Sequence, residues 1–424
     1  MSASAEISHV VDHLFRHEAG RMVATLARIF GLQNLSLAED VVQEALLRAL
    51  QTWSFGNVPQ NPSAWILQVA KRLALDVIRR ERTFLSKENE IAHSIESTAG
   101  TVSDYDSLFM EGEIRDDQLR MMFACCHPAL PREAQVALTL KTLCGFSERE
   151  IAAAFLVSPA AIAKRLVRAR QKIRDDRMPF AIPASADLSP RLDAMLQVLY
   201  LLHNEGYKAS EGDQLVRDDL CDEALRLANL LIEHRAGNQP RTHALVALMW
   251  LNIARLAARV DADGNLLLLA EQDRSLWDLR MIQRGLFHLN ESAAGERITE
   301  FHLQAGIAFC HCTARTYADT DWRRILELYD LLVAINPSPV LALNRAVAVF
   351  KAQGAAEGLD AVNNIAEIGT LDSYYLLHAV RGEMHSALGR QAEAAVCFRK
   401  ALQFTSVKSE RAFLEKKLRG CESN

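Results

Sequence analysis

The chemistry best supported by residue type and spacing is phosphate binding by the basic stretch 159–177. This stretch carries seven Lys and Arg residues against two Asp residues. That many cations on a few helical turns would neutralise several nucleic-acid phosphates and release their counterions. The alternative is the solvated basic face of an ordinary amphipathic helix. The residues that we expect to face DNA are Ser158, Ala160, Ala161, Lys164, Arg165, Arg168 and Arg170.

Two helices must position these side chains. Ser147 and Glu150 have the spacing of a capping box, which predicts a helix start there. A turn follows at 156–157, and Ser158 before Pro159 predicts the start of a second helix. The side chains expected to face inward are Ile151, Ala154 and Phe155 in the first helix and Ile162, Leu166 and Ile173 in the second. The pattern is a helix-turn-helix, whose second helix would enter the major groove with its later arginines on the DNA backbone.

A second basic stretch, 65–82, lies earlier in the chain. It holds five basic and two acidic residues and follows a helix cap at Asn61 and Pro62. An aromatic ring beside a basic stripe suits single-stranded DNA, because the ring stacks on an unpaired base while the cations follow the phosphates. For Trp65 itself we favour an ordinary core position, so the basic side chains carry the prediction. The candidate residues are Trp65, Lys71, Arg72, Arg79 and Arg80.

Two further helices are expected before these stretches. The first covers about 7–30, and the second begins after Ser36, whose spacing to Glu39 is again that of a capping box. Its inward side chains are Val41, Ala45 and Leu46, and its outward ones are Asp40, Gln43, Glu44 and Arg48. The second helix therefore combines a buried apolar side with a polar, partly acidic face.

The amino-acid composition limits which classes of protein this chain can belong to. A chain of 424 residues, half of them apolar, suggests two or three domains. We expect no membrane span, because even the most apolar run, 243–258, is interrupted by polar side chains, and we expect no secretory signal. The eight Cys residues form no disulfide framework, so reduced thiols are expected. A metal site at Cys125, Cys126 and His127 is the alternative, but paired CxxC ligands are missing, and we expect no metal or other cofactor.

The rest of the chain divides into a linker and a helical region. Residues 84–117 are acidic and poor in large apolar groups, which is typical of a mobile linker. From 184 to 424 the sequence reads as amphipathic helices rich in Ala and Leu. Gly354 and Gly389 lie 35 residues apart, close to the 34-residue period of tetratricopeptide helix pairs, and this repeat is clearest at 320–420. The whole chain is therefore expected to be all-α.

Three of these motifs, in this order, resemble the bacterial extracytoplasmic-function sigma factors of the sigma-70 family. They are the helix that contains Asp40, the stretch 62–81 and the helix-turn-helix, which together cover about 7–178. The remainder resembles the C-terminal extension of the group of these factors that carries a tetratricopeptide-like domain. The motifs that carry this second likeness are 201–207, 271–277 and 319–324.

The resemblance implies a fold, a function and partners. It implies sigma-70 region 2 at 6–83, a linker at 84–117, region 4 at 118–178 and a helical extension at 184–424. The implied function is binding of core RNA polymerase, at the β′ clamp helices and the β flap, and direction of transcription initiation at promoter DNA. The residues implied in binding the core enzyme are Asp40, Val41, Gln43, Glu44 and Leu47.

The resemblance also implies which stretch meets which promoter element. The set around Trp65 would hold the −10 element, and the helix that starts at Ser158 would read the −35 element. The acidic linker would thread toward the polymerase active site and mimic nucleic acid there. The extension would regulate the factor or bind a protein or peptide. Such a protein works in the cytoplasm and has no catalytic residue of its own.

Two other functions use parts of the same pattern. An operator-binding regulator would use the helix-turn-helix, with the helical repeats as its sensor, but it leaves the Asp40 helix and the 65–82 stretch without a role. A scaffold protein would bind partners through its repeats, and its basic helix would be incidental. Dependence on core polymerase separates the sigma factor from both.

Overall fold

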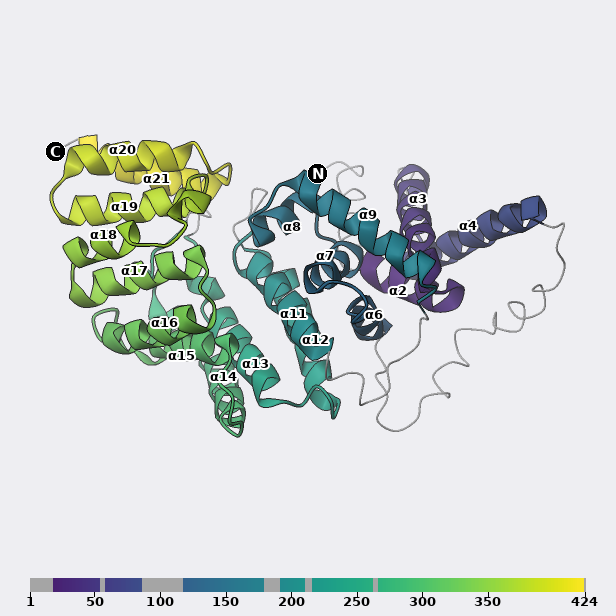
Figure 1. The fold of residues 1–424 in the computed structure, drawn as a ribbon, viewed down its shortest axis with the longest axis horizontal. Helices are drawn as coiled ribbons and strands as arrows, with labels where there is room; N and C mark the ends of the chain where they lie inside the picture. The colour runs from purple at the N-terminus through teal and green to yellow at the C-terminus, as the bar shows by residue number, and fades with distance from the viewer. Residues whose placement is uncertain are drawn as a thin grey trace. The chain divides into compact units, whose positions relative to one another are not determined.

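The fold is described from a computed structural model, which covers residues 18–53, 58–85, 117–178, 191–209, 216–261 and 266–422 (Figure 1). Within these ranges every regular element is a helix, apart from one isolated bridge between Val260 and Leu266. The predicted all-α class is confirmed. None of the described helices is long and apolar enough to cross a membrane. The chain forms two compact units, 1–202 with 233–237 and 203–232 with 238–424, and each is described by itself.

The first unit begins with four helical elements that share one core. Gly31 has a positive φ of 87°, which turns the chain sharply between the first two of them. The third packs against both the first and the fourth, and its Trp53 is fully buried. The elements are α2 (Ala19–Phe30), the short η1 (Leu32–Asn34), α3 (Leu35–Trp53) and α4 (Pro62–Leu85). The predicted cap of α4 is confirmed, because Asn61 Oδ1 accepts a hydrogen bond from the Ala64 N–H at 3.0 Å.

The predicted start of α3 is wrong. The helix begins at Leu35, directly after η1, so Ser36 lies inside it. Glu39 does not reach back to cap the helix, because its carboxylate is held by Thr142 and Arg170 instead. A hydroxyl and a guanidinium from other helices thus replace the local cap. The predicted first helix is described only from Ala19 onward, since 1–17 lie outside the described residues.

Four helices carry the second half of the first unit. They are α6 (Asp117–Cys125), α7 (Arg132–Leu143), α8 (Glu148–Phe155) and α9 (Pro159–Asp175). The helix-turn-helix is confirmed: Ser147 and Glu150 form the capping box, Leu156 turns the chain with φ 53°, and Ser158 caps α9. Its inward residues are buried as predicted, except that Ala154 is exposed and Phe155 only half-buried. The buried alanine of α8 is Ala152, which lies next to the fully buried Ile151 on the core side of the helix.

The two predicted sigma regions pack together. Helix α2 contacts α6 and α7, and η1 contacts α9. The predicted acidic linker lies almost wholly at 86–116, outside the described residues. Helix α11 (Leu192–Tyr207) belongs to the first unit up to Leu202 and to the second from His203.

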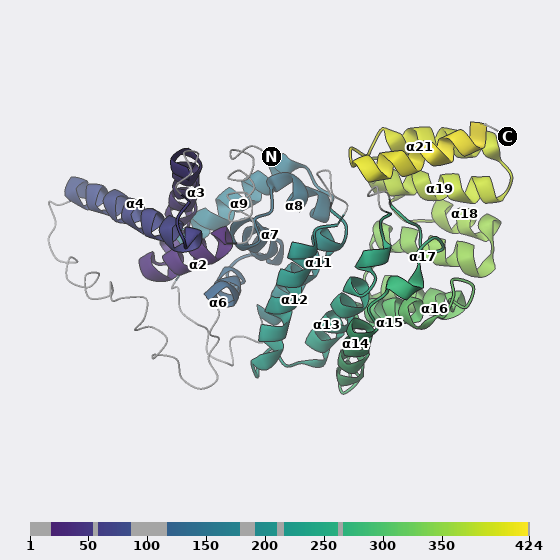
Figure 2. The same cartoon turned by 180° about the vertical axis from the view of Figure 1, so that it is seen from behind.

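The second unit is a succession of helices, and from α13 onward each packs on the next (Figure 2). Gly354 and Gly389, the glycines of the predicted repeat, both have positive φ, 130° and 74°, and lie between consecutive helices. Three apolar clusters lie along the later helices, and each joins neighbouring helices. The helices are α12 (Asp218–Glu233), α13 (Pro240–Ile253), α14 (Leu279–Ser292), α15 (Glu300–Thr313), α16 (Trp322–Ile335), α17 (Pro339–Gln353), α18 (Ala355–Asn363), α19 (Tyr375–Ala387), α20 (Gln391–Leu402) and α21 (Lys408–Glu422).

Candidate nucleic-acid interface

Helix α9 presents a basic face to solvent. Its inner side is anchored by Ile162, Leu166, Ala169 and Ile173, which are all buried, so the opposite side of the helix faces solvent. Ser158 also caps the helix, since its Oγ accepts a hydrogen bond from the Ala161 N–H at 3.3 Å. The members of the predicted DNA-facing set that are exposed are Ser158, Ala160, Ala161, Lys164 and Arg168.

The other two members of that set are engaged within the protein. Arg165 pairs with Glu133 of α7 at 2.5 Å, and its guanidinium lies 5.3 Å from the centre of the Phe155 ring. Arg170 pairs with Glu39 of α3 at 2.9 Å. Sequence periodicity places both on the accessible part of α9, but it does not show the acidic partners that come from other helices. The structure therefore divides the set into five exposed residues and two paired ones.

Val167 is a residue of this face that sequence reasoning missed. Its side chain is 65% exposed, one turn after Lys164 and next to Arg168. An apolar side chain on a basic face of this kind suits contact with a thymine methyl group. The available signal was its spacing, three residues beyond Lys164, which puts both on one side of the helix.

A groove of about 470 Å³ lies beside the basic face, between α7 and α9. Its floor is apolar, with Leu130, Ala134 and Ala169. Lys164 and Arg168 line it as well, so the groove and the basic face share side chains. An apolar floor beside cations suits a protein segment more than a nucleic acid.

Helix α4 presents a second basic face. Arg72, Arg79 and Arg80 are exposed, and Lys71 is half-buried. Trp65 is half-buried and packs on Trp53 of α3, with ring centroids 5.5 Å apart. This contact supports the core position that we favoured for Trp65. The structure therefore groups the basic members of the predicted −10 set and gives Trp65 a packing partner.

Helix α3 presents the polar face expected for the core-binding set, with one correction. Asp40, Gln43 and Glu44 are exposed, whereas Val41 is only 5% exposed and points into the core. Val41 cannot contact a partner, because it lies on the same side of the helix as the buried Ala45. Leu47 is 55% exposed, so this polar face also carries one exposed apolar side chain of the set.

Glu39 lies between this helix and the helix-turn-helix. Its Oε1 accepts a hydrogen bond from the Thr142 hydroxyl at 2.7 Å, and both carboxylate oxygens accept from Arg170 Nη2, at 2.9 and 3.2 Å. The side chains of Glu39 and Arg170 are 17% and 22% exposed. Charge-assisted hydrogen bonds at such distances are stronger than neutral ones.

The cysteine thiols near this contact are buried and unreactive. Cys125, Cys126 and Cys144 are buried and reduced. Burial raises the pKa of Cys126 to about 12 and raises the pKa of Cys125 well above its usual value, so both thiols stay protonated at neutral pH. Burial also lowers the pKa of His127. Among the described residues, no group of three or more His, Cys, Asp or Glu side chains is arranged to hold a metal ion.

Two protein-family models match the first unit, one over its α2–α4 part and one over its α6–α9 part. The model of sigma-70 region 2 matches residues 14–84, and the model of sigma-70 region 4 matches residues 120–173. A third model, of a family of unknown function, matches 191–293 in the extension. No solved structure matches the chain. The region 2 match favours a sigma factor over an operator-binding regulator, which has no use for that region.

Individual relatives agree with this assignment. An uncharacterized protein of Rhizobium meliloti is 38% identical over 93% of this chain and 92% of its own length. A probable RNA polymerase sigma factor RfaY of Xanthomonas campestris is 28% identical over 34% of this chain and 35% of its own length. The ECF RNA polymerase sigma factor SigE of Mycolicibacterium smegmatis is 26% identical over 39% of this chain and 60% of its own length. The chain therefore belongs to the sigma-70 family of RNA polymerase sigma factors, as an extracytoplasmic-function type with a long C-terminal extension.

Proposed function

We propose that the exposed face of α3 binds core RNA polymerase at the β′ clamp helices. The face comprises Asp40, Gln43, Glu44 and Leu47, all of them exposed. One exposed Leu surrounded by polar side chains is typical of a small binding hot spot. The apolar side chain loses its water on binding, and the polar side chains around it orient the partner. This arrangement is the observation that carries the proposal. The groove between α7 and α9 is our candidate for the contact with the β flap.

We propose that the two basic faces bind the promoter. Arg72, Arg79 and Arg80 of α4 would follow the phosphates of the −10 strand, with Lys71 at their edge. Helix α9 would enter the major groove of the −35 element through Ser158, Ala160 and Ala161. Lys164 and Arg168 would then bind bases or phosphates beyond them.

The extension is proposed to regulate the sigma regions in cis. Its first helix is docked on region 4: Arg191, just before α11, donates a hydrogen bond to the Phe123 carbonyl at 2.9 Å, and Arg132 Nε donates to Gln197 Oε1 at 3.2 Å. Because α11 continues without a break into the second unit, a change in that unit has a direct path to region 4. The stacked helices are proposed to bind a protein or peptide. The protein would act by binding alone, in the cytoplasm, with no catalytic residue.

Run-off transcription tests the central proposal. Purified core polymerase is combined with the full-length protein on selected promoter fragments. The wild type is compared with an Asp40→Ala, Gln43→Ala, Glu44→Ala triple variant. We expect core-dependent initiation from the wild type and a loss of at least tenfold in the triple variant, since several interface contacts vanish together. A Gln283→Ala, Asn290→Ala variant, in exposed positions of α14, is the control. Duplex binding without polymerase and without initiation would instead support the operator-binding regulator.

A test of the extension uses a chain that ends at Ile182. We expect altered strength or control of transcription, because the helix docked on region 4 is removed. Unchanged transcription by the shortened chain would show that the extension does not regulate in cis.

A further inference from the structure

Two arginines of the second unit lie against one tryptophan ring. The guanidinium carbons of Arg255 and Arg274 are 5.3 and 4.4 Å from the centre of the Trp277 ring. Arg255 follows the end of α13, and Arg274 begins the short η6 (Arg274–Leu276), which leads into Trp277. Within the described part of the chain, neither arginine forms an ion pair with a carboxylate. Two positive charges therefore share one ring without a negative charge to neutralise them.

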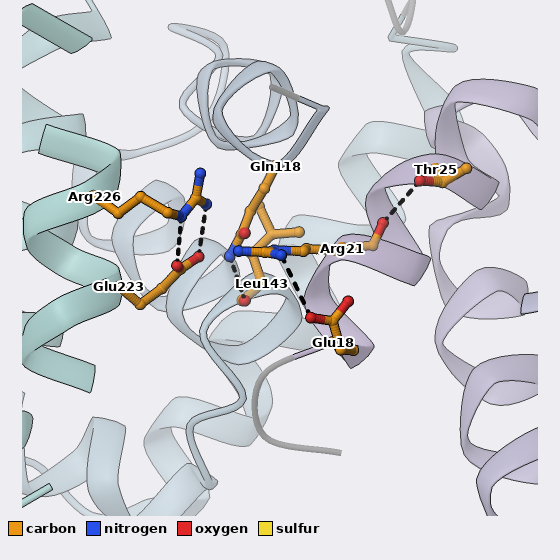
Figure 3. A network of polar contacts seen from close by, with 7 residues as sticks. All are labelled: Glu18, Arg21, Thr25, Gln118, Leu143, Glu223 and Arg226. Carbon is orange, nitrogen blue, oxygen red and sulfur yellow. Dashed lines mark hydrogen bonds and ion pairs between the residues drawn. The ribbon is translucent and has the colours of Figure 1, made fainter. Parts of the chain in front are cut away.

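This arrangement is unusual for arginine at such depth. Arg255 is only 8% exposed, and buried arginines are nearly always paired, because an uncompensated buried charge is costly. Figure 3 shows the ordinary arrangement elsewhere in the chain, where Arg226 donates to both carboxylate oxygens of Glu223, at 2.7 and 2.8 Å. Among the described residues, the charge of Arg255 has no such counterpart.

A third arginine adds to the positive charge. Arg259 is also 8% exposed, lies 3.7 Å from the centre of the Tyr207 ring and donates a hydrogen bond to the Tyr207 carbonyl oxygen. Burial, and then the charge of Arg255, lowers the pKa of Arg259 and also that of Arg274. Arg255 is thus within electrostatic range of both, and the positive potential is concentrated around it.

Unpartnered hydrogen-bond donors accompany these charges. Four buried nitrogen atoms have no hydrogen-bond partner among the described residues: Arg255 Nε, Arg274 Nη2, Trp277 Nε1 and His311 Nδ1. Buried polar atoms are nearly always hydrogen-bonded, so four in one place indicate a bound group. The first three atoms can only donate, and the Nδ1 of a neutral histidine can donate as well. The missing partner therefore supplies acceptor atoms and negative charge.

The surrounding elements hold these side chains in place. Arg274 Nη1 donates to the carbonyl oxygen of His311 at 2.9 Å, which ties η6 to the end of α15. The His311 ring packs edge-on against Trp322 of α16, with ring centroids 5.4 Å apart. The stretches 271–277 and 319–324, which the sequence singled out in the extension, thus meet at one place in the second unit.

We propose that the arginine cluster, defined as Arg255, Arg274, Trp277 and His311, binds a phosphate group. Guanidinium groups match phosphate oxygens in geometry and charge. A phosphate monoester carries about 1.5–2 negative charges at neutral pH, whereas a carboxylate carries one, so a phosphate better balances two uncompensated arginines. Arg274 and His311 are half-buried, so the cluster reaches the protein surface. The site gives the extension a small-molecule ligand, beyond the protein or peptide proposed above.

Thermal unfolding of the full-length protein at constant ionic strength tests this site. Inorganic phosphate, glycerol 3-phosphate and acetate are titrated separately, because a ligand that binds only the folded state raises the unfolding midpoint. Calorimetric titration gives each affinity. The variants are Arg255→Gln and Arg274→Gln. The matched control is Arg284→Gln, which removes an exposed arginine that lies 4.9 Å from the centre of a different ring, that of Trp250.

We expect phosphate to raise the midpoint of the wild type and of Arg284→Gln, with equal affinities. Arg255→Gln and Arg274→Gln should bind phosphate at least tenfold more weakly, and the half-buried position of Arg274 keeps the test valid if Arg255→Gln fails to fold. Tighter binding of glycerol 3-phosphate than of inorganic phosphate would identify a phosphate ester as the ligand, and the reverse order would identify free phosphate. No shift with either phosphate, an equal shift in all four proteins, or an equal shift with acetate would overturn the phosphate site.

Discussion

Trp65 of α4 packs on Trp53 of α3 with ring centroids 5.5 Å apart and ring planes inclined at 57°. Trp53 is fully buried and Trp65 half-buried. Tilted aromatic pairs of this kind stabilise by about 0.5–1.5 kcal/mol beyond their buried area. The pair fixes α4 on α3, so the basic face of α4 keeps a defined position relative to the face assigned to polymerase.

Replacement of Trp65 should therefore affect folding before it affects DNA binding. We expect Trp65→Ala to lower the free energy of unfolding by about 2–4 kcal/mol, since a large half-buried ring is removed. Trp65→Phe retains an aromatic ring and should cost less than half of that. Urea unfolding measures both. If Trp65→Phe kept full stability and lost −10 strand binding, base stacking by Trp65 would be the better account.

Two apolar residues of α3, one exposed and one buried, should behave in opposite ways. Leu47→Ala should leave stability within about 0.5 kcal/mol, because the side chain is exposed, and should weaken binding of core polymerase about tenfold. Val41→Ala should destabilise the protein by about 1–2.5 kcal/mol and leave the affinity of the folded protein unchanged. Titration with labelled core enzyme and urea unfolding separate the two effects. Equal affinities of Leu47→Ala and wild type would remove Leu47 from the interface.

Arg168 should contribute a phosphate contact. We expect Arg168→Ala in the holoenzyme to weaken promoter binding and to reduce the slope of log affinity against log salt concentration by about 0.9, the value for one phosphate contact. Arg323→Ala, an exposed arginine of α16, is the control and should leave the slope unchanged. Filter binding across a salt series gives the slope. A slope identical in both variants would place Arg168 away from the phosphates.

Gly20 should tolerate no side chain. Gly20→Ala places a methyl group 2.1 Å from the Leu143 carbonyl oxygen, and we expect a loss of about 1–3 kcal/mol or separation of α2 from α7. Gly369→Ala is the matched control, since nothing lies within 4 Å of its added Cβ. Urea unfolding measures the loss. Equal stability of the two variants would contradict the close approach.

The second unit should lose stability in mild acid. His203 is fully buried, and neither ring nitrogen has a hydrogen-bond partner among the described residues. Burial, and then the nearby Arg259, lowers the pKa of His203 to about 3. The unfolded chain therefore binds one more proton between about pH 3 and 6.5, so this stability is complete above pH 6.5 and is lost as the pH falls.

Substitution of His203 isolates its contribution to the pH dependence of the unfolding free energy. Between pH 7.5 and 5.5 the loss from His203 alone should be about 1.4 kcal/mol. His311, with a pKa of about 3, and His288, with a pKa of about 4, add to the total in the wild type. His203→Phe should reduce the difference in unfolding free energy between the two pH values by about 1.4 kcal/mol. An unchanged difference would mean that the pKa of His203 is the same in the folded and unfolded chains.

Local motifs were predictable where their partners are close in the chain. The capping box of Ser147 and Glu150 formed as expected, and so did the turn at Leu156 and the cap at Ser158. The same motif failed at Ser36, although its spacing to Glu39 is identical. The difference is that Thr142 and Arg170 compete for Glu39 from more than a hundred residues away.

The sequence by itself determined the helices, the helix-turn-helix, the basic faces of α4 and α9 and the family, because caps, periodicity and charge act over a few residues. Only the tertiary structure decided which members of those faces are accessible. Arg165 and Arg170 are paired with Glu133 and Glu39, and Val167 is exposed. Such pairings depend on which helices meet in space, and contacts between distant segments leave no mark in the spacing of either one.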